Sequence, residues 1–372
     1  MSEPTSATIA AVETTTVSAR AKGALRVVGA RVTHDASTFA LVRVVTDEGV
    51  EGFGEVSATA AWSGEDATTA VHFVRDVLAP VLVGRPLAPI EAHAKEFDRV
   101  LRGNWFTKAG VSTALWDALG RTLGVGIAEL LGGPYRREVP VKISLSGDGD
   151  DLRAAYETAA GLGFQAFKVK VGREPGADAA RVALARELAG DAALLGADAN
   201  GGWPLATALE TVPRLVESRI AFIEQPVQPD DLEGLREVRA LGVPLIADES
   251  VYSAADVLRI GRLGAADVVS VYVGKSSALE RAVASARLAA ELGLDVVIGA
   301  NGEMGLGAAA QLHVACACER LSEIPHGITG HHFYEEEPTL ATPLDIDGRV
   351  ARLPEGPGLG VEPSDDVRRS FS

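Results

Sequence analysis

Lysine and carboxylate side chains recur at nearly regular intervals through the second half of this chain. Five of them are Lys170, Asp198, Glu224, Asp248 and Lys275. The intervals between them are 28, 26, 24 and 27 residues, each about the length of one strand plus one helix. Each residue also closes a short apolar run. If these runs are strands of a parallel barrel, all five side chains meet at the carboxyl-terminal rim, where such barrels hold their active sites.

The segments between these residues support that interpretation. Alanine- and leucine-rich amphipathic stretches alternate with short apolar runs, which is typical of a parallel α/β fold. Eight strands are predicted, near 139–145, 166–171, 193–198, 220–224, 244–248, 268–274, 295–299 and 321–325. The last is the weakest, because it is short and contains Pro325, which argues for a terminal position.

The first 135 residues follow a different pattern. Two alternating runs, 39–45 and 50–55, flank a turn at 47–49 and predict a β-hairpin. Helical spacing of apolar residues follows in three stretches, and strands followed by helices indicate an α+β domain. The predicted helices are 70–82, 89–101 and 109–123. The Pro- and Gly-containing tail is expected to fold back against this first domain.

Several motifs together resemble the enolase superfamily, and within its mandelate racemase and muconate lactonizing enzyme family the muconate lactonizing enzyme subgroup. They are Lys168-Val-Lys170, Asp198-Ala-Asn200, Glu224-Gln-Pro226, Ala247-Asp-Glu-Ser250, Lys275 and Pro357-Gly-Leu-Gly360, with Ala114-Leu-Trp-Asp-Ala-Leu-Gly120 and Leu130-Leu-Gly-Gly133 in the first domain. The resemblance implies a modified TIM barrel of (β/α)7β type. Residues 1–135 would form a capping domain, 136–337 the barrel with the metal site, and 338–372 a segment that returns to the cap.

Asp198, Glu224 and Asp248 are the predicted metal ligands. Three carboxylates from successive strand ends suit Mg²⁺, which prefers hard oxygen ligands and keeps positions for water and substrate, with Mn²⁺ as a possible substitute. The alternative for a single acid at a strand end is that it caps the next helix. Three acids at unit spacing favour the metal site, where the ion would stabilise the enolate formed when a carboxylate substrate loses its α-proton.

Lys168, Lys170 and Lys275 are the predicted catalytic lysines. Lys170 and Lys275 leave the second and sixth strands, so they are expected to face each other across the pocket as two bases. Lys168 is assigned to the substrate carboxylate or to tuning Lys170. For Lys275 alone, a solvated loop lysine is the competing interpretation.

Five further residues are candidates for supporting or substrate-binding roles. Asn200 and Glu249 are interpreted as supports, and the resemblance implies that Glu249 assists the far lysine. Glu303 is assigned equally to loop geometry or to the pocket. His326 is more often structural in such a position than a substrate contact. Trp62 lies in one of two segments, 19–29 and 59–65, expected to close over the barrel mouth, where it either packs on substrate or anchors the two domains.

Composition limits the possible partners and compartments. The chain has 372 residues, 35 basic against 51 acidic, and a formal charge of −16, which disfavours nucleic acid and anionic membranes. Neither a leader peptide nor a membrane-spanning run is recognisable, so a cytoplasmic location is expected. Cys316 and Cys318 are interpreted as buried residues without a disulfide or zinc role.

Three functions remain open at this point. The first is a magnesium-dependent isomerase of a small carboxylate substrate, either a muconate cycloisomerase or a racemase or epimerase of an α-substituted acid such as an N-acyl amino acid. The second is an acid or acid-sugar dehydratase on the same scaffold. The third is a catalytically silent ligand-binding relative, which the complete set of acids and lysines argues against. Homo-oligomers are expected from the resemblance only.

Overall fold

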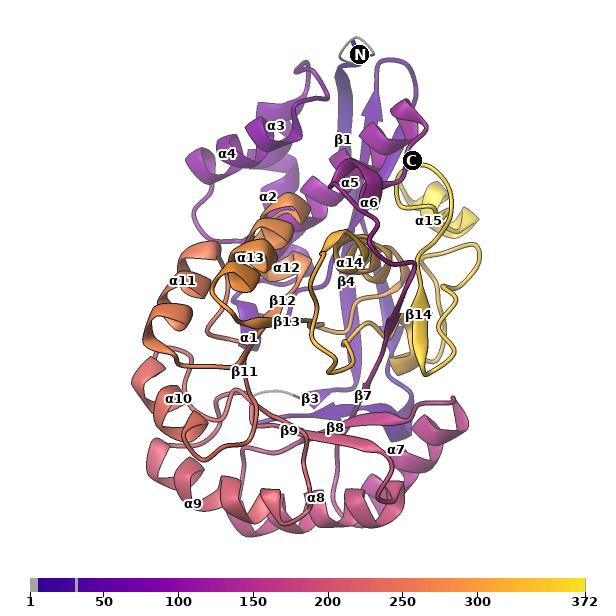
Figure 1. Cartoon of the computed structure of the whole chain (residues 1–372). Coiled ribbons are helices and arrows are strands. Elements are labelled where there is room, and N and C mark those ends of the chain that lie inside the picture. Colours follow the sequence, from indigo (N-terminus) through magenta and orange to yellow (C-terminus); the bar gives the residue numbers. More distant parts are fainter. Residues whose placement is uncertain (1–5, 31–32, 372) are drawn as a thin grey trace.

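The amino-terminal part of the molecule is a three-stranded antiparallel sheet covered by helices (Figure 1). The computed structural model describes residues 6–30 and 33–371. The sheet has the order β1-β4-β5, formed by β1 (Ile9–Arg20), β4 (Ala36–Thr46) and β5 (Glu51–Val56). The predicted hairpin is therefore confirmed as β4 and β5. Strand β1 was not predicted, although it pairs with β4 over its whole length.

Helix α5 (Trp105–Leu123) packs unusually close to β5. A Cβ atom at Gly52 would lie 2.2 Å from the carbonyl oxygen of Ala114, and one at Gly54 would lie 2.0 Å from that of Gly110. No side chain fits at either glycine without moving the helix. The two glycines of the Gly52-Phe-Gly54 run therefore set the spacing between helix and sheet.

The remaining helices of this part are shorter than α5, and α4 (Ile90–Val100) and α6 (Ile127–Leu130) contact α5. The predicted helix at 70–82 is divided by a π-helical turn at Val74–Leu78. The others are α1 (Ala60–Ser63), α2 (Ala67–Phe73) and α3 (Ala79–Leu82). A 3-10 turn at Gly23–Leu25 and the short pair β2 (Val27–Val28) and β3 (Thr33–His34) lie between β1 and β4.

Seven parallel strands form the barrel sheet, in the order β13-β12-β11-β10-β9-β8-β7. They are β7 (Ile143–Leu145), β8 (Ala166–Lys170), β9 (Leu194–Asp198), β10 (Ile223–Glu224), β11 (Leu245–Ala247), β12 (Val268–Val271) and β13 (Asp295–Ile298). The predicted eighth strand at 321–325 is wrong. Pro325 has no N–H to donate, and the segment bonds to its neighbours only at separate points. Ser322 donates to Val296, and His326 and Gly327 bond to Pro140, Lys142 and Ile298 and so join the two edges.

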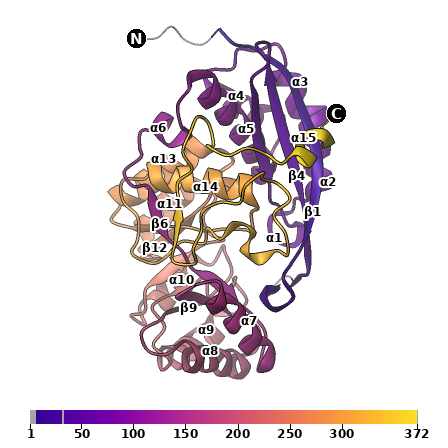
Figure 2. The ribbon, with the colours of Figure 1, turned by 90° about the vertical axis from the view of Figure 1, so that its right-hand side faces the viewer.

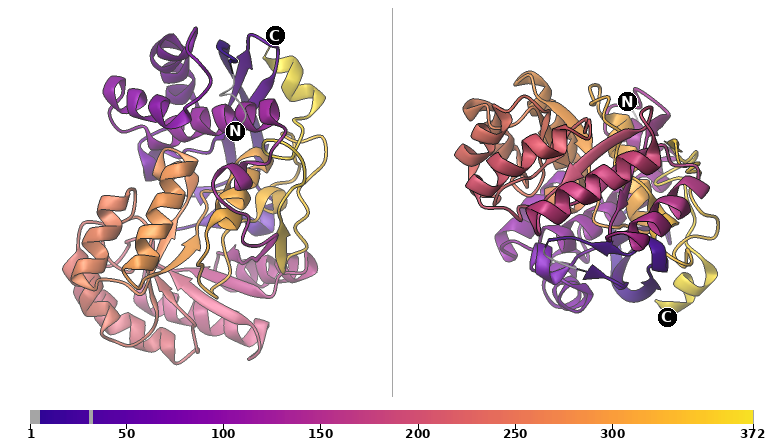
Figure 3. Two further views of the ribbon diagram at one scale, coloured as in Figure 1. Left: turned by 45° about the horizontal axis from the view of Figure 1, so that its top comes forward. Right: turned by 90° about the horizontal axis from the view of Figure 1, so that it is seen from below.

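Helices lie along the outer side of this sheet, as Figures 1 and 3 show. They are α7 (Asp150–Gly161), α8 (Pro175–Ala189), α9 (Leu205–Val216), α10 (Leu232–Arg239), α11 (Ala254–Leu263), α13 (Leu279–Glu291) and α14 (Gly305–Ala317). Local signals start several of them. Pro175 opens α8 and the Glu174 side chain accepts the N–H groups of Gly176 and Ala177, while Ser253 and Asp256 form a capping box at α11.

The two parts are joined at the start of α14 and by the carboxyl-terminal segment. Glu55 of β5 accepts the backbone N–H groups of Met304 and Gly307 at 2.7 and 3.0 Å. Strand β14 (Val350–Arg352) pairs with β6 (Glu138–Pro140), and the chain then returns to the first domain, where α15 (Asp365–Ser370) lies beside β4 (Figure 2). Cys316 and Cys318 are buried free thiols, as predicted. In the described part of the chain, no helix has the length and apolar character needed to cross a membrane.

Candidate active site

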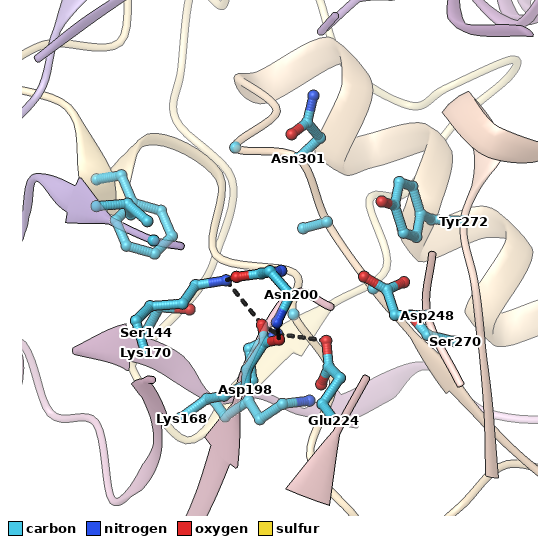
Figure 4. A pocket seen from close by; sticks show the side chains of 18 of the residues that line it. Ser144, Lys168, Lys170, Asp198, Asn200, Glu224, Asp248, Ser270, Tyr272 and Asn301 are labelled. Atoms are coloured by element: carbon cyan, nitrogen blue, oxygen red, sulfur yellow. Dashed lines mark hydrogen bonds and ion pairs between the residues drawn. The ribbon is translucent and has the colours of Figure 1, made fainter. Parts of the chain in front are cut away.

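A cavity of about 110 Å³ lies at the carboxyl ends of the barrel strands, beneath the first domain. Its barrel side includes Lys168, Lys170, Asp198, Glu224 and Asp248, so the structure brings most of the predicted site together. Figure 4 shows Ser144 and Lys170 on one side of the cavity and Asp248, Ser270 and Tyr272 on the other. The strand spacing therefore places these charged side chains at one rim, as expected.

Asp198 and Glu224 are neighbours because β9 and β10 pair in parallel with these two residues opposite each other. Both carboxylates are almost completely buried. Lys168 bridges them, with Nζ 2.9 Å from Asp198 Oδ2 and 2.6 Å from Glu224 Oε1. Burial lowers the pKa of Lys168, but the charges of Asp198 and Glu224 outweigh this effect and hold that pKa well above its ordinary value. The two carboxylates therefore favour the protonated form of Lys168 in this arrangement.

Lys170 reaches the cavity from the end of β8. Its Nζ lies 2.7 Å from Asp198 Oδ2 and 2.9 Å from Asn200 Oδ1. Burial raises the pKa of Asp198, whereas Lys168 and Lys170 lower it more strongly, so the pKa falls well below its ordinary value. The Asp198 carboxylate is ionised throughout the physiological range.

Lys275 takes a different position from the one predicted. Strand β12 ends at Val271 and the chain turns into the short helix α12 (Val273–Ser276), which directs the Lys275 side chain behind Asp248. Its Nζ donates to Asp248 Oδ1 and to the Asp248 carbonyl oxygen, both at 2.6 Å, and to the Ser270 carbonyl oxygen at 2.8 Å. Lys275 is fully buried, and among the described residues it is not part of the cavity wall. The structure therefore does not place Lys275 in the cavity wall, and its role as a base opposite Lys170 stays a prediction.

The three acids have the donor chemistry that a hard divalent cation requires. Asp198, Glu224 and Asp248 follow adjacent strands, line one cavity and are at least nine-tenths buried. Their negative charges require positive partners, because burying an unpaired carboxylate is costly. Ammonium groups fill that role here, and within the described residues no three acidic, imidazole or thiol groups converge as a metal cluster. The three carboxylates supply the oxygen ligands that Mg²⁺ prefers. In this structure the Lys168 ammonium group lies between an Asp198 oxygen and a Glu224 oxygen that would bind the ion.

Glu249, Glu303 and His326 lie behind the cavity wall. Glu249 Oε1 accepts Asn200 Nδ2 at 2.9 Å, so Glu249 supports the Lys170 side and not the far lysine that the resemblance implied. Glu303 accepts the Asn301 backbone N–H, which makes it a loop-shaping residue. His326 Nδ1 accepts the Ile298 N–H at 3.0 Å, and burial lowers its pKa to about 3. Its contacts are those of a structural residue at the barrel closure.

Sequence reasoning missed several residues of the barrel wall. Lys142, Ser144, Ser270, Tyr272 and Asn301 all line the cavity. Lys142 is buried, donates to the Pro325 carbonyl oxygen, and has its pKa lowered to about 8 by burial. A signal was present, since Lys142-Ile-Ser144 and Ser270-Val-Tyr272 repeat the polar–apolar–polar alternation of Lys168-Val-Lys170. In each case alternate residues of a barrel strand point inward.

The first domain supplies a largely apolar opposite wall. Both predicted cap segments reach the cavity, one through Ala21, Leu25 and Val27 and the other through Trp62. A third segment, which the sequence did not reveal and which follows the barrel strands, contributes Phe333 at the end of a 3-10 turn (Gly330–Phe333) and the next residue, Tyr334. This third segment is hydrogen-bonded to the cap segment 19–29, where the Lys22 N–H donates to the Phe333 carbonyl oxygen at 2.8 Å.

Comparisons with known proteins agree with this architecture. The family model "Mandelate racemase / muconate lactonizing enzyme, N-terminal domain" matches residues 11–132, and "Enolase C-terminal domain-like" matches 151–367. Muconate cycloisomerase 1 of Rhodococcus opacus is 37% identical over 340 residues, covering 89% of this chain and 90% of the relative. The N-succinyl-L-Arg/Lys racemase of Bacillus cereus is 30% identical, covering 89% of both chains. A muconate lactonizing enzyme from Pseudomonas fluorescens, solved with muconolactone, superposes with a TM-score of 0.91 at 28% identity, covering 99% of this chain and 100% of that one.

Proposed function

Because the chain belongs to the mandelate racemase and muconate lactonizing enzyme family of the enolase superfamily, we propose that it is a magnesium-dependent cycloisomerase of a muconate-type diacid. The chain is an isomerase of that superfamily. The observation that carries the finer proposal is the unequal placement of the two lysines. Lys170 lines the cavity, whereas Lys275 is buried behind Asp248. A single lysine that faces the cavity suits a reaction in which one proton is exchanged on one face of the substrate.

The reaction conserves every atom of the substrate. One carboxylate oxygen forms a bond to the carbon γ to its own carboxyl, which is the β-carbon of the other carboxylate. The π bond between that carbon and the next one breaks, and a proton is added at the carbon next to the other carboxylate. Lys170 delivers that proton, and in the reverse direction removes it. Lys168, whose protonated form is favoured by Asp198 and Glu224, holds the substrate carboxylate.

Asp198, Glu224 and Asp248 would hold Mg²⁺, which would supply Lewis-acid stabilisation of the negative charge that develops on the substrate carboxylate. The apolar residues of the first domain exclude water from the reacting carbon. Their contribution is desolvation, which strengthens the electrostatic interactions inside the cavity.

Racemisation of an N-acyl amino acid is the second candidate. The observation in its favour is that a second lysine, Lys275, is present on the opposite side of Asp248 from the cavity. Proton exchange from both faces would require Lys275 to leave Asp248 and the Ser270 carbonyl oxygen and to enter the cavity. The relative from Bacillus cereus bears the name of such a racemase.

Proton NMR in D₂O with Mg²⁺ tests the proposal. The substrates are cis,cis-muconate, N-succinyl amino acids, dipeptides and acid sugars. We expect muconate to be converted to its lactone with one deuterium at a single diastereotopic position beside the free carboxylate. Exchange and racemisation of an N-acyl amino acid, with muconate unchanged, would favour the second candidate. Loss of water from an acid sugar would select a dehydratase, and no reaction of muconate under any condition contradicts the cycloisomerase.

A further inference from the structure

Trp62 connects the first domain to the barrel by two kinds of contact. Its ring stacks on Tyr272, with 5.9 Å between centroids and 29° between planes, and meets Phe106 edge-on at 5.7 Å. Its indole Nε1 donates a hydrogen bond to Glu249 Oε1 at 3.2 Å. A phenylalanine at this position would make similar ring contacts and could anchor the domains equally well. The hydrogen bond is specific to the indole.

The Glu249 oxygen that accepts from Trp62 also accepts from Asn200. Asn200 Nδ2 lies 2.9 Å from Glu249 Oε1, and Asn200 Oδ1 lies 2.9 Å from Lys170 Nζ. Trp62, Glu249, Asn200 and Lys170 therefore form a continuous chain of hydrogen bonds, here named the Trp62–Lys170 chain. Glu249 and Asn200 are each more than nine-tenths buried, so water does not readily replace these bonds.

This chain fixes the orientation of the Asn200 amide. The two ends of an asparagine amide have nearly the same size, and their placement depends on the surrounding hydrogen bonds. Glu249 is an acceptor and draws the NH₂ group towards itself, so the carbonyl oxygen faces Lys170. A reversed amide would present N–H groups to the lysine nitrogen and repel it.

The orientation of Asn200 in turn orients the lysine. Lys170 Nζ directs one N–H to Asp198 Oδ2 and another to Asn200 Oδ1. With two of its three positions committed, the nitrogen has one position left for the proton exchanged with substrate. Small changes in the direction of that position change the rate of proton transfer strongly, because the reacting atoms must be aligned.

We propose that Trp62 is a positioning residue for proton transfer and acts on Lys170 through Glu249 and Asn200. This inference rests on the role proposed for Lys170. It makes the chemical step in the barrel depend on the packing of the first domain against it, because Trp62 of that domain supplies the indole N–H to Glu249. Direct contact between Trp62 and substrate is the competing explanation for its place in the cavity wall.

The first experiment compares Trp62→Phe with Trp105→Phe, using cis,cis-muconate and Mg²⁺. Phenylalanine at position 62 keeps an aromatic ring but removes the N–H donor. Trp105 is a matched control, because its ring also contacts Tyr252 but lies outside the Trp62–Lys170 chain. We expect kcat to fall roughly tenfold in Trp62→Phe, with KM within about twofold and an unchanged melting temperature. Trp105→Phe should keep the wild-type kcat.

A double variant tests whether the effect passes through Asn200. Asn200 has a left-handed backbone with φ 45°, so Asn200→Gly removes the side chain and tolerates that conformation. Trp62→Phe should reduce kcat no further in the Asn200→Gly background, since both changes break the same chain. Multiplicative losses would contradict the inference, as would an unchanged kcat or a rise in KM alone.

A measurement without turnover separates this inference from the proposed function. The side-chain amide signals of Asn200 in ¹⁵N-labelled protein are identified by their loss in Asn200→Gly. They should shift in Trp62→Phe and stay in place in Trp105→Phe. Wild-type protein that fails to convert muconate but shows this pattern would overturn the cycloisomerase and keep the positioning role. Unchanged amide signals in Trp62→Phe would overturn the positioning role whatever the substrate.

Discussion

The two walls of the cavity differ sharply in chemistry. The barrel wall carries ionisable groups, among them Lys168, Lys170, Asp198, Glu224 and Asp248, whereas the wall from the first domain is built mainly from residues such as Ala21, Leu25 and Val27. Charged groups stand on barrel strands whose hydrogen bonds fix their positions, and apolar groups stand on connecting segments. Because of this division, residues of the first domain can change the substrate preference while the charged residues of the barrel, which carry the chemistry, stay the same. Trp62 joins the first domain to the barrel by a side-chain hydrogen bond to Glu249.

The largest loss of activity is expected when a lysine is removed from the barrel wall. Lys170→Ala should lower kcat by roughly 10³-fold or more, because it removes the group that moves the proton. Lys275→Met should leave part of the muconate turnover, since that side chain lies behind Asp248, whereas a racemase would lose all activity. Deuterium incorporation and melting temperature are the measurements. Lys95→Ala is the control, because Lys95 is an exposed lysine. Full activity of Lys170→Ala would contradict the proposed mechanism.

The metal set gives the next effect in size. Glu224→Gln should weaken Mg²⁺ binding by more than roughly tenfold, since even outer residues of metal sites change affinity by that factor. Calorimetric titration with Mg²⁺, without substrate, measures this directly. The exposed Glu233→Gln is the matched control, and equal Mg²⁺ affinity in Glu224→Gln and wild type would exclude Glu224 as a ligand.

The smallest effect is expected on the apolar wall. Leu25→Val removes one methylene from a residue that lines the cavity, so it should change KM by about tenfold or less and leave kcat nearly constant. Steady-state kinetics with cis,cis-muconate and a bulkier substituted muconate would show whether the preference between them changes. A large loss of kcat with both substrates would show that this wall also takes part in the chemistry.

The predictions from sequence succeeded where a regular element fixes a residue. Parallel strands place Asp198 and Glu224 side by side, and one period of strand plus helix sufficed to anticipate this. The position of Lys275 could not be anticipated, because it depends on the turn from β12 into α12. Strand β1 was missed because its Thr- and Ala-rich run lacks the alternation of a half-buried strand, although its pairing with β4 stabilises it.

The carboxyl-terminal segment has a consequence for how the molecule is made. Asp117 of α5 accepts the Leu359 N–H at 2.8 Å, Arg121 pairs with Glu362 at 2.7 Å, and Arg368 pairs with Glu51 of β5 at 2.6 Å. A ribosome releases residues 359–368 only after the whole barrel has been synthesised. The first domain, whose strands precede the barrel in the sequence, therefore acquires these contacts only after the barrel has been synthesised. All barrel strands are thus synthesised before the first domain that covers them has all of its contacts.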